Sequence, residues 1–150
     1  MKTKSGQWFE CKVRYERMQE NGTTKKVTEA YVVDALSFTE AEARIIDEMT
    51  AYISGEFAVC NINPTPFKEI VFVDDATADK YFKVKVGYIT INEKTGKEKV
   101  SNTTYLVQAK NTDEAQKATH DMHKGGVQDY VIKSVTETKI LDVYEHTINN

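Results

Sequence analysis

The chain contains 150 residues, 40% of them hydrophobic, and carries 20 Lys and Arg against 23 Asp and Glu, for a formal net charge of −3. This apolar content supports a packed core and excludes an intrinsically disordered chain. No window approaches 18 consecutive apolar residues, and residues 1–7 lack the apolar segment of a secretory signal, so we expect neither a membrane span nor export. Two cysteines, Cys11 and Cys60, are too few for a disulfide framework, which favours buried thiols in a cytoplasmic protein.

The first half of the chain opens with a predicted β-hairpin. Residues 8–17 alternate apolar and polar side chains, as a half-buried strand does. Asn21-Gly22 is typical of a tight turn, and a second strand is expected at about 25–36.

A helix and an extended tail are expected next. Ser37 and Glu40 form a capping box, in which each side chain satisfies a backbone N–H of the first helical turn. Apolar residues then recur at helical spacing: Phe38, Ala41, Ile45, Met49 and Tyr52. Gly55 is expected to end this helix, and 57–73 predicts one or two strands, interrupted by two prolines.

The second half of the chain predicts the same elements in the same order. Strands are expected at 81–91 and 98–110, joined through Thr95-Gly96. Asn111 is the expected N-cap of a shorter helix, and 127–146 predicts another extended tail. The inward face of this helix is expected to contain Ala115, Thr119 and Met122.

Two blocks of sequence recur at nearly the same spacing. Residues 8–15 align with 81–88 at an offset of 73, and 30–41 align with 104–115 at an offset of 74, with nine of 20 positions identical. A period this long is typical of a duplicated small domain rather than a solenoid. We therefore predict an α+β fold of two tandem ββαβ(β) repeats, with antiparallel sheets, one helix per repeat and pseudo-two-fold symmetry.

The repeat predicts the domain organisation. The first ββαβ repeat is expected to span 1–73, a short acidic linker 74–79, and the second repeat 80–150. Because the linker is short, we expect the repeats to pack together as one body.

The whole chain resembles a family of small uncharacterised proteins of about this length in Bacteroidetes-type bacteria and their mobile elements. The resemblance is carried by Trp8-Phe9-x-Cys11-Lys12-Val13-x-Tyr15 and by the segment Val32-Val33-Asp34-Ala35-Leu36-Ser37-Phe38-Thr39-Glu40-Ala41-Glu42-Ala43. That family is classed as a domain of unknown function, so the resemblance implies no site residue, cofactor or partner.

The charge of −3 conceals a segregation of charge. Residues 1–26 and 80–100 each carry a net charge of +4, so the remainder carries −11. Alternation places the basic residues of the first strands on the face opposite the core, beside an aromatic residue. Cations beside a ring on an open sheet face are typical of single-stranded nucleic-acid binding. The candidate binding residues are Trp8, Lys12, Arg14, Tyr81, Lys83 and Lys85.

A second hypothesis belongs to a different class. Lys and Arg also occur on solvated hairpin edges, where they oppose strand-to-strand aggregation. In this hypothesis the protein is an assembly or adaptor protein, such as a component of a mobile element or a phage. It contacts a protein partner or a second copy of itself.

The sequence contains no recognised catalytic or cofactor motif, so we expect a non-catalytic protein without cofactor or metal. His120 and His123 lack an identifiable third ligand, and we expect both to be exposed helix side chains. The acidic run around Asp74, Asp75 and Asp79 lacks the spacing of a calcium loop.

Overall fold

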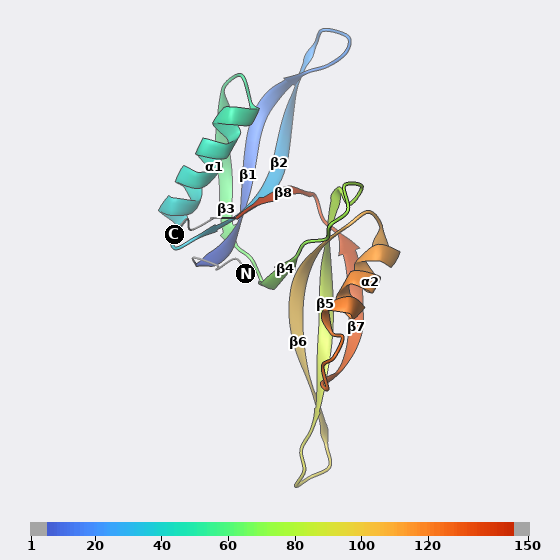
Figure 1. Ribbon diagram of the computed structural model, residues 1–150. Helices are drawn as coiled ribbons and strands as arrows, with labels where there is room; N and C mark the ends of the chain where they lie inside the picture. Colours follow the sequence, from blue (N-terminus) through green and yellow to red (C-terminus); the bar gives the residue numbers. More distant parts are fainter. Residues whose placement is uncertain (1–5, 146–150) are drawn as a thin grey trace. The chain divides into compact units, whose positions relative to one another are not determined.

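The computed structural model describes residues 6–145, which form an α+β fold with eight strands in two sheets and two helices. The order of elements is strand, strand, helix, strand, strand, and this order occurs twice (Figure 1). The first five elements are β1 (Gln7–Met18), β2 (Thr24–Ala35), α1 (Phe38–Tyr52), β3 (Phe57–Pro64) and β4 (Phe67–Val71). The second five are β5 (Lys80–Ile91), β6 (Glu98–Ala109), α2 (Thr112–Met122), β7 (Asp129–Glu137) and β8 (Ile140–Tyr144).

The chain divides into two compact units. Unit 1 contains Met1–Thr65 and Lys139–Asn150, and unit 2 contains Pro66–Thr138. Sheet A, in unit 1, has the strand order β3-β1-β2-β8, and sheet B, in unit 2, has the order β7-β5-β6-β4. The residues predicted as a linker, 74–79, therefore lie inside unit 2 rather than at its border.

The fourth strand of each sheet comes from the other half of the chain. β8 pairs with β2 in parallel, and β4 pairs with β6 in parallel, whereas the other strand pairs are antiparallel. The prediction of antiparallel sheets is thus right for three strands of each sheet and wrong for the fourth. The physical reason lies in the two connections, Thr65-Pro66 between β3 and β4 and Thr138-Lys139 between β7 and β8, because neither contains the Gly, Asn or Asp that a tight hairpin turn favours.

A threonine fixes the chain at each point where it leaves one sheet for the other. Thr65 donates two hydrogen bonds to the carbonyl oxygen of Trp8, from N at 2.9 Å and from Oγ1 at 3.0 Å. Thr138 donates in the same way to the carbonyl oxygen of Tyr81, at 2.9 and 2.7 Å. Each threonine therefore sets the exit of its chain toward the next strand.

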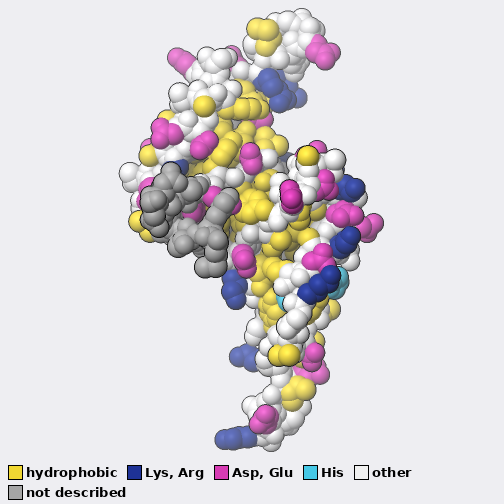
Figure 2. Space-filling model, in the orientation of Figure 1, with side chains coloured by type: hydrophobic (Ala, Val, Ile, Leu, Met, Phe, Trp, Pro, Cys, Tyr) yellow, Lys and Arg dark blue, Asp and Glu magenta, His cyan; other side chains and the backbone are white. Residues whose placement is uncertain are grey.

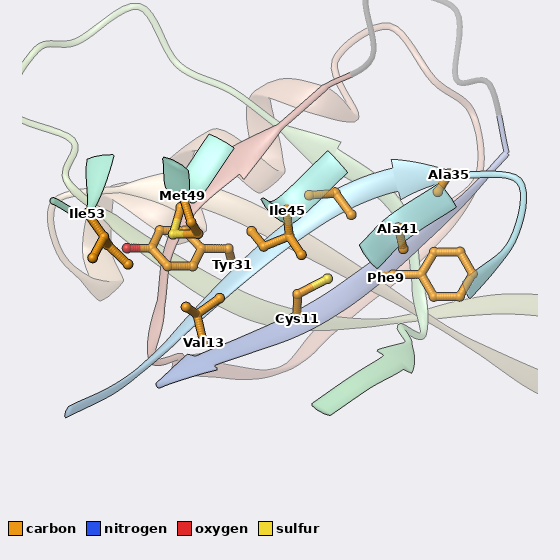
Figure 3. Packing of buried hydrophobic residues seen from close by; sticks show 10 residues of the cluster. Phe9, Cys11, Val13, Tyr31, Ala35, Ala41, Ile45, Met49 and Ile53 are labelled. Atoms are coloured by element: carbon orange, nitrogen blue, oxygen red, sulfur yellow. The ribbon is translucent and has the colours of Figure 1, made fainter. Parts of the chain in front are cut away.

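Helix α1 covers one face of sheet A. Ala41, Ile45 and Met49 are fully buried, and Figure 3 shows them pointing onto side chains of β1 and β2 such as Cys11. The apolar residues at helical spacing extend beyond this buried face at both ends of α1, because Phe38 is 53% exposed and Tyr52 is 62% exposed. The remaining core members include Phe9, Val13, Tyr31, Val33, Ala35 and Ile53.

Both helices begin with the predicted caps. The Oγ of Ser37 accepts a hydrogen bond from Glu40 N at 3.1 Å, and Oδ1 of Asn111 accepts one from Glu114 N at 2.8 Å. Both helices end earlier than their glycines, with C-caps at Ile53 and His123. The capping box therefore predicted the start of each helix better than glycine predicted its end.

Helix α2 covers sheet B with a smaller apolar face, as expected. Ala115 and Thr119 are fully buried and Met122 is half-buried. The Oγ1 of Thr119 donates to the carbonyl oxygen of Ala115 at 2.8 Å, which satisfies a buried hydroxyl inside the helix. The strand residues beneath are Phe82, Val84, Val86, Tyr105, Val107 and Ala109.

The acidic segment 74–79 is an ordered turn. Asp75 Oδ1 accepts hydrogen bonds from Thr77 N at 2.9 Å and from Thr77 Oγ1 at 2.7 Å, and these bonds lower the pKa of the Asp75 carboxyl. Ala78 is buried. The Asp75 carboxylate therefore stabilises the turn of its own segment.

We expect Ile45→Ala to lower the free energy of unfolding by about 2–4 kcal/mol, because Ile45 is fully buried and its removal leaves a cavity. The matched control is Ile46→Ala, one residue away and 39% exposed, which we expect to change stability by about 0.5 kcal/mol or less. Urea unfolding followed by circular dichroism measures both. Equal effects of the two substitutions would contradict the burial pattern of α1.

The two cysteines should differ in reactivity. Cys11 is fully buried, and burial raises the pKa of its thiol to about 12, so only about one part in 10,000 is thiolate at pH 8. Cys60 is exposed, which corrects the prediction that both thiols are buried. We expect a thiol reagent to modify one group per native chain at pH 8, and Cys60→Ser to abolish that reaction. Fast modification of two groups would show that the core of unit 1 is open.

Candidate functional site

The predicted cations lie on the faces of the sheets that the helices leave uncovered. In β1, Lys12 and Arg14 alternate with core residues and are exposed. In β5, Lys83 is exposed and Lys85 is half-buried, and both alternate with core residues in the same way. We call these faces, opposite α1 and α2, the outer faces of sheets A and B.

The two predicted rings are buried. Trp8 is 6% exposed and Tyr81 is 4% exposed. Both lie near the start of a first strand, at the end of the sheet where a fourth strand is added. The alternation of apolar and polar residues in the sequence predicts on which face of each sheet Trp8 and Tyr81 lie. It does not predict that this end of the face is covered. Trp8 and Tyr81 therefore offer no open ring for stacking on a base.

The outer face of sheet B carries a cluster of three lysines, formed by Lys83, Lys85 and Lys133. Lys83 and Lys85 lie on the central strand β5, and Lys133 lies on the neighbouring strand β7. The residues directly opposite Lys83 and Lys85 on the two adjacent strands are Leu106, Thr104, Thr136 and Ser134. None of them is acidic, so the cluster has a neutral surrounding that is rich in hydroxyl groups.

Sequence reasoning missed Lys133 because of a β-bulge. The pairing of β5 with β7 shifts between Lys85 and Val86, which leaves Lys133 without a directly opposite residue. Its stem extends over Gly87, where a Cβ atom would come within 3.0 Å of Lys133 Cε. A basic residue on β7 was visible in the sequence, but the bulge that brings it beside Lys85 was not.

The outer face of sheet A has a mixed charge at the same positions. Glu10 occupies the position of Lys83, Lys12 that of Lys85, and Arg14 that of Gly87. Glu16 follows on the same face. The two predicted halves of the binding surface are therefore unequal, and sheet B carries the stronger positive charge.

Apolar side chains continue the outer face of sheet B along its hairpin. Val100 is 44% exposed, Val131 is 45% exposed and Ile91 is 63% exposed, and Ile89 is half-buried between their strands. The same positions in sheet A hold Lys26, Ala58, Met18 and Glu16. The lysine cluster of sheet B thus borders an exposed apolar surface that sheet A lacks.

A separate network in unit 2 joins His123 to tyrosines. Nδ1 of His123 lies 2.7 Å from the carbonyl oxygen of Thr119, and Nε2 lies 2.7 Å from the hydroxyl of Tyr88, which is 2.6 Å from that of Tyr105. Since a carbonyl only accepts, Nδ1 of His123 carries a proton and donates it to the carbonyl oxygen of Thr119. The ring also stacks on Tyr130 at 3.9 Å. Burial and the bond to Tyr88 raise the pKa of Tyr105.

Unit 1 has a carboxylate in its corresponding tyrosine cluster. The hydroxyl of Tyr31 donates to Glu29 Oε1 at 3.1 Å, and Arg17 Nη1 lies 3.9 Å from Glu29 Oε2. Burial, followed by hydrogen bonding to Glu29, raises the pKa of Tyr15 to about 12. Glu29 is thus held by neighbours of its own unit.

The described residues contain no group of three or more His, Cys, Asp or Glu that could hold a metal ion. Nδ1 of His120 lies 2.6 Å from the hydroxyl of Tyr130, so both histidines contact tyrosines. His120 is exposed as predicted, whereas His123 is half-buried, which corrects the prediction for that residue. Across residues 6–145, the structure has no helix whose length and apolar character would allow it to cross a membrane.

Comparison with known proteins gives a family but no characterised relative. No curated protein and no solved structure matches the chain. One family model, described as "Domain of unknown function (DUF4494)", matches residues 7–146 and so covers all of the described strands and both helices. The chain therefore belongs to the DUF4494 family, a domain of unknown function.

Proposed function

We propose that this protein binds single-stranded nucleic acid on the outer face of sheet B, without catalysing a reaction. The observation that carries the proposal is the cluster of Lys83, Lys85 and Lys133, which has no acidic residue directly opposite it. Lysines that neutralise phosphates supply most of the affinity in sequence-independent binding.

The surroundings of the cluster support phosphate binding. Within the part of the chain that is described, none of the three lysines takes part in an ion pair. Their ammonium groups therefore need not exchange one partner for another when a phosphate arrives. The hydroxyls of Thr104, Ser134 and Thr136 add hydrogen-bond donors for phosphate and sugar oxygens on the same face.

The bases need a different surface from the one predicted. Because Trp8 and Tyr81 are buried, base contact in this proposal shifts to the exposed apolar side chains of Val100, Val131 and Ile91. Aliphatic contact is weaker than stacking on an aromatic ring, so we expect affinity to depend mainly on the phosphates and therefore on salt. Lys12 and Arg14 on sheet A play a smaller part, since Glu10 and Glu16 share their face.

We expect the triple substitution Lys83→Ala, Lys85→Ala and Lys133→Ala to weaken binding of fluorescein-labelled oligo(dT) at least tenfold, as measured by fluorescence anisotropy at 50 mM salt. Because each phosphate contact contributes about −0.7 to the slope of log affinity against log salt, the slope should become less negative by ~2.

The matched control removes the same charge from the exposed tip of the same hairpin, at its turn and at the start of β6, through Lys94→Ala, Lys97→Ala and Lys99→Ala. We expect this variant to retain binding within about threefold, because these residues lie outside the cluster. Equal losses in the two triple variants would contradict a site on the outer face, and no binding by the wild-type protein at low salt would exclude the function.

We also infer that the two halves of the chain arose by internal duplication. Both halves have the same order of elements, and the sheets show a register shift at the same place, between Lys12 and Val13 and between Lys85 and Val86. Thr65 and Thr138 each donate twice to a carbonyl 57 residues earlier. The Bacteroidetes-type origin and the cytoplasmic location stay predictions.

An assembly function is the second candidate, and the exposed apolar surface of sheet B favours it. If this surface joins copies of the chain, light scattering should show a dimer or larger species, and Val100→Lys with Val131→Lys should give a monomer, because the new charges would have to be buried. A wild-type monomer at all concentrations tested would rule out self-assembly through this surface.

A further inference from the structure

Half of β2 has a neighbouring strand on one side only. β8 pairs with β2 at Ala30–Val33, whereas residues 24–29 pair only with β1. In such a segment, alternate residues direct their N–H and C=O groups away from the sheet. Within residues 6–145, no strand pairs with residues 24–29 on the side away from β1. We call residues 24–29 the free edge of β2.

A groove of about 350 Å³ follows this free edge. It is lined by Arg17, Lys25, Lys26, Val27, Thr28, Glu29, Lys139 and Leu141. These residues come from β1, from the free edge itself, from β8 and from the residue just before β8, all within unit 1. The groove therefore continues the line along which β8 is already added to the sheet.

The groove is strongly basic. It contains Arg17 and three lysines but one carboxylate, that of Glu29, whose side chain is only 9% exposed and accepts a hydrogen bond from Tyr31. Figure 2 shows Lys and Arg side chains gathered just below the tip of the β1–β2 hairpin. A ligand in this groove therefore meets a positive field with little competing negative charge.

The cations lie on both faces of the edge. Arg17 and Lys25 are paired across β1 and β2 and share the face of α1, whereas Lys26 follows on the opposite face. A strand placed along the edge directs its side chains alternately to the two faces. Acidic side chains on either face of that strand would meet a cation.

The free edge of sheet B has a different character. Its first half, residues 98–103, also lacks a fourth strand, because β4 pairs with β6 only from Thr104 onward. At the positions of Arg17 and Lys25 it has Thr90 and Lys99. The basic groove is thus particular to unit 1. Its positive charge is not a general feature of the fold, because the equivalent edge of sheet B lacks the pair of cations.

We propose that the free edge of β2 binds an acidic, extended segment of a partner protein, which adds to sheet A as a further strand. A peptide backbone offers N–H and C=O groups in alternation, as the edge requires. A nucleic-acid backbone has phosphate acceptors but no donors in that spacing, so the edge favours a peptide over nucleic acid. This site is independent of the lysine cluster on sheet B.

The test uses fluorescein-labelled Val-Glu-Val-Glu-Val-Glu and the full-length protein, with anisotropy at 50 mM salt as the readout. We expect saturable binding, at least tenfold weaker for Val-Lys-Val-Lys-Val-Lys and for a Val-Glu peptide N-methylated at alternate residues. N-methylation keeps the charge but removes backbone donors, so it separates strand addition from attraction by charge alone. Hydrogen exchange should slow at residues 24–29 when the acidic peptide is bound.

The variant Lys25→Glu with Lys139→Glu should weaken binding at least tenfold, whereas Lys97→Glu with Lys99→Glu, on the hairpin of sheet B, should leave it within about threefold. The triple alanine variant of the sheet B cluster should also bind the acidic peptide normally. The proposal is overturned if the peptide does not bind, if the N-methylated peptide binds equally well, or if oligo(dT) rather than peptide protects residues 24–29 from exchange.

Discussion

The parallel pairing of β8 with β2, and of β4 with β6, is the constraint on which the rest of the structure depends. A parallel neighbour cannot follow directly from a tight turn, and here the two needed strands are supplied by the opposite halves of the chain. Neither half of the sequence alone contains a complete unit. Thr65 and Thr138 each donate two hydrogen bonds to one carbonyl oxygen of the sheet. They fix the backbone at the two points where the chain leaves one sheet for the other.

The exchange also determines which surfaces remain open. Each added strand is short and pairs with only four residues of a 12-residue neighbour, so part of β2 and of β6 is left as a free edge. The rings at the start of β1 and β5 lie at the end where the strand is added and are buried, whereas the cations farther along these strands stay accessible. The surfaces that stay open in this fold therefore lie on the hairpin portions of the sheets, away from the added strands.

The two units use one architecture for surfaces of different chemistry. Sheet A combines Glu10 with Lys12 and Arg14 on its outer face and concentrates cations at its edge. Sheet B has lysines with no acidic residue directly opposite them on its outer face, and exposed apolar residues beyond them. The proposals follow this division, with nucleic acid on the face of sheet B and an acidic peptide at the edge of sheet A.

The sequence by itself determined the local elements. Alternation in 8–17 and 81–91, the caps at Ser37 and Asn111, and the apolar spacing of α1 depend on neighbours within a few residues, so they could be read directly. Only the tertiary structure decided that β4 and β8 change sheets, that Trp8 and Tyr81 are covered, and that a bulge brings Lys133 beside Lys85. Those outcomes depend on pairing between segments far apart in the chain, for which side-chain periodicity has no signal.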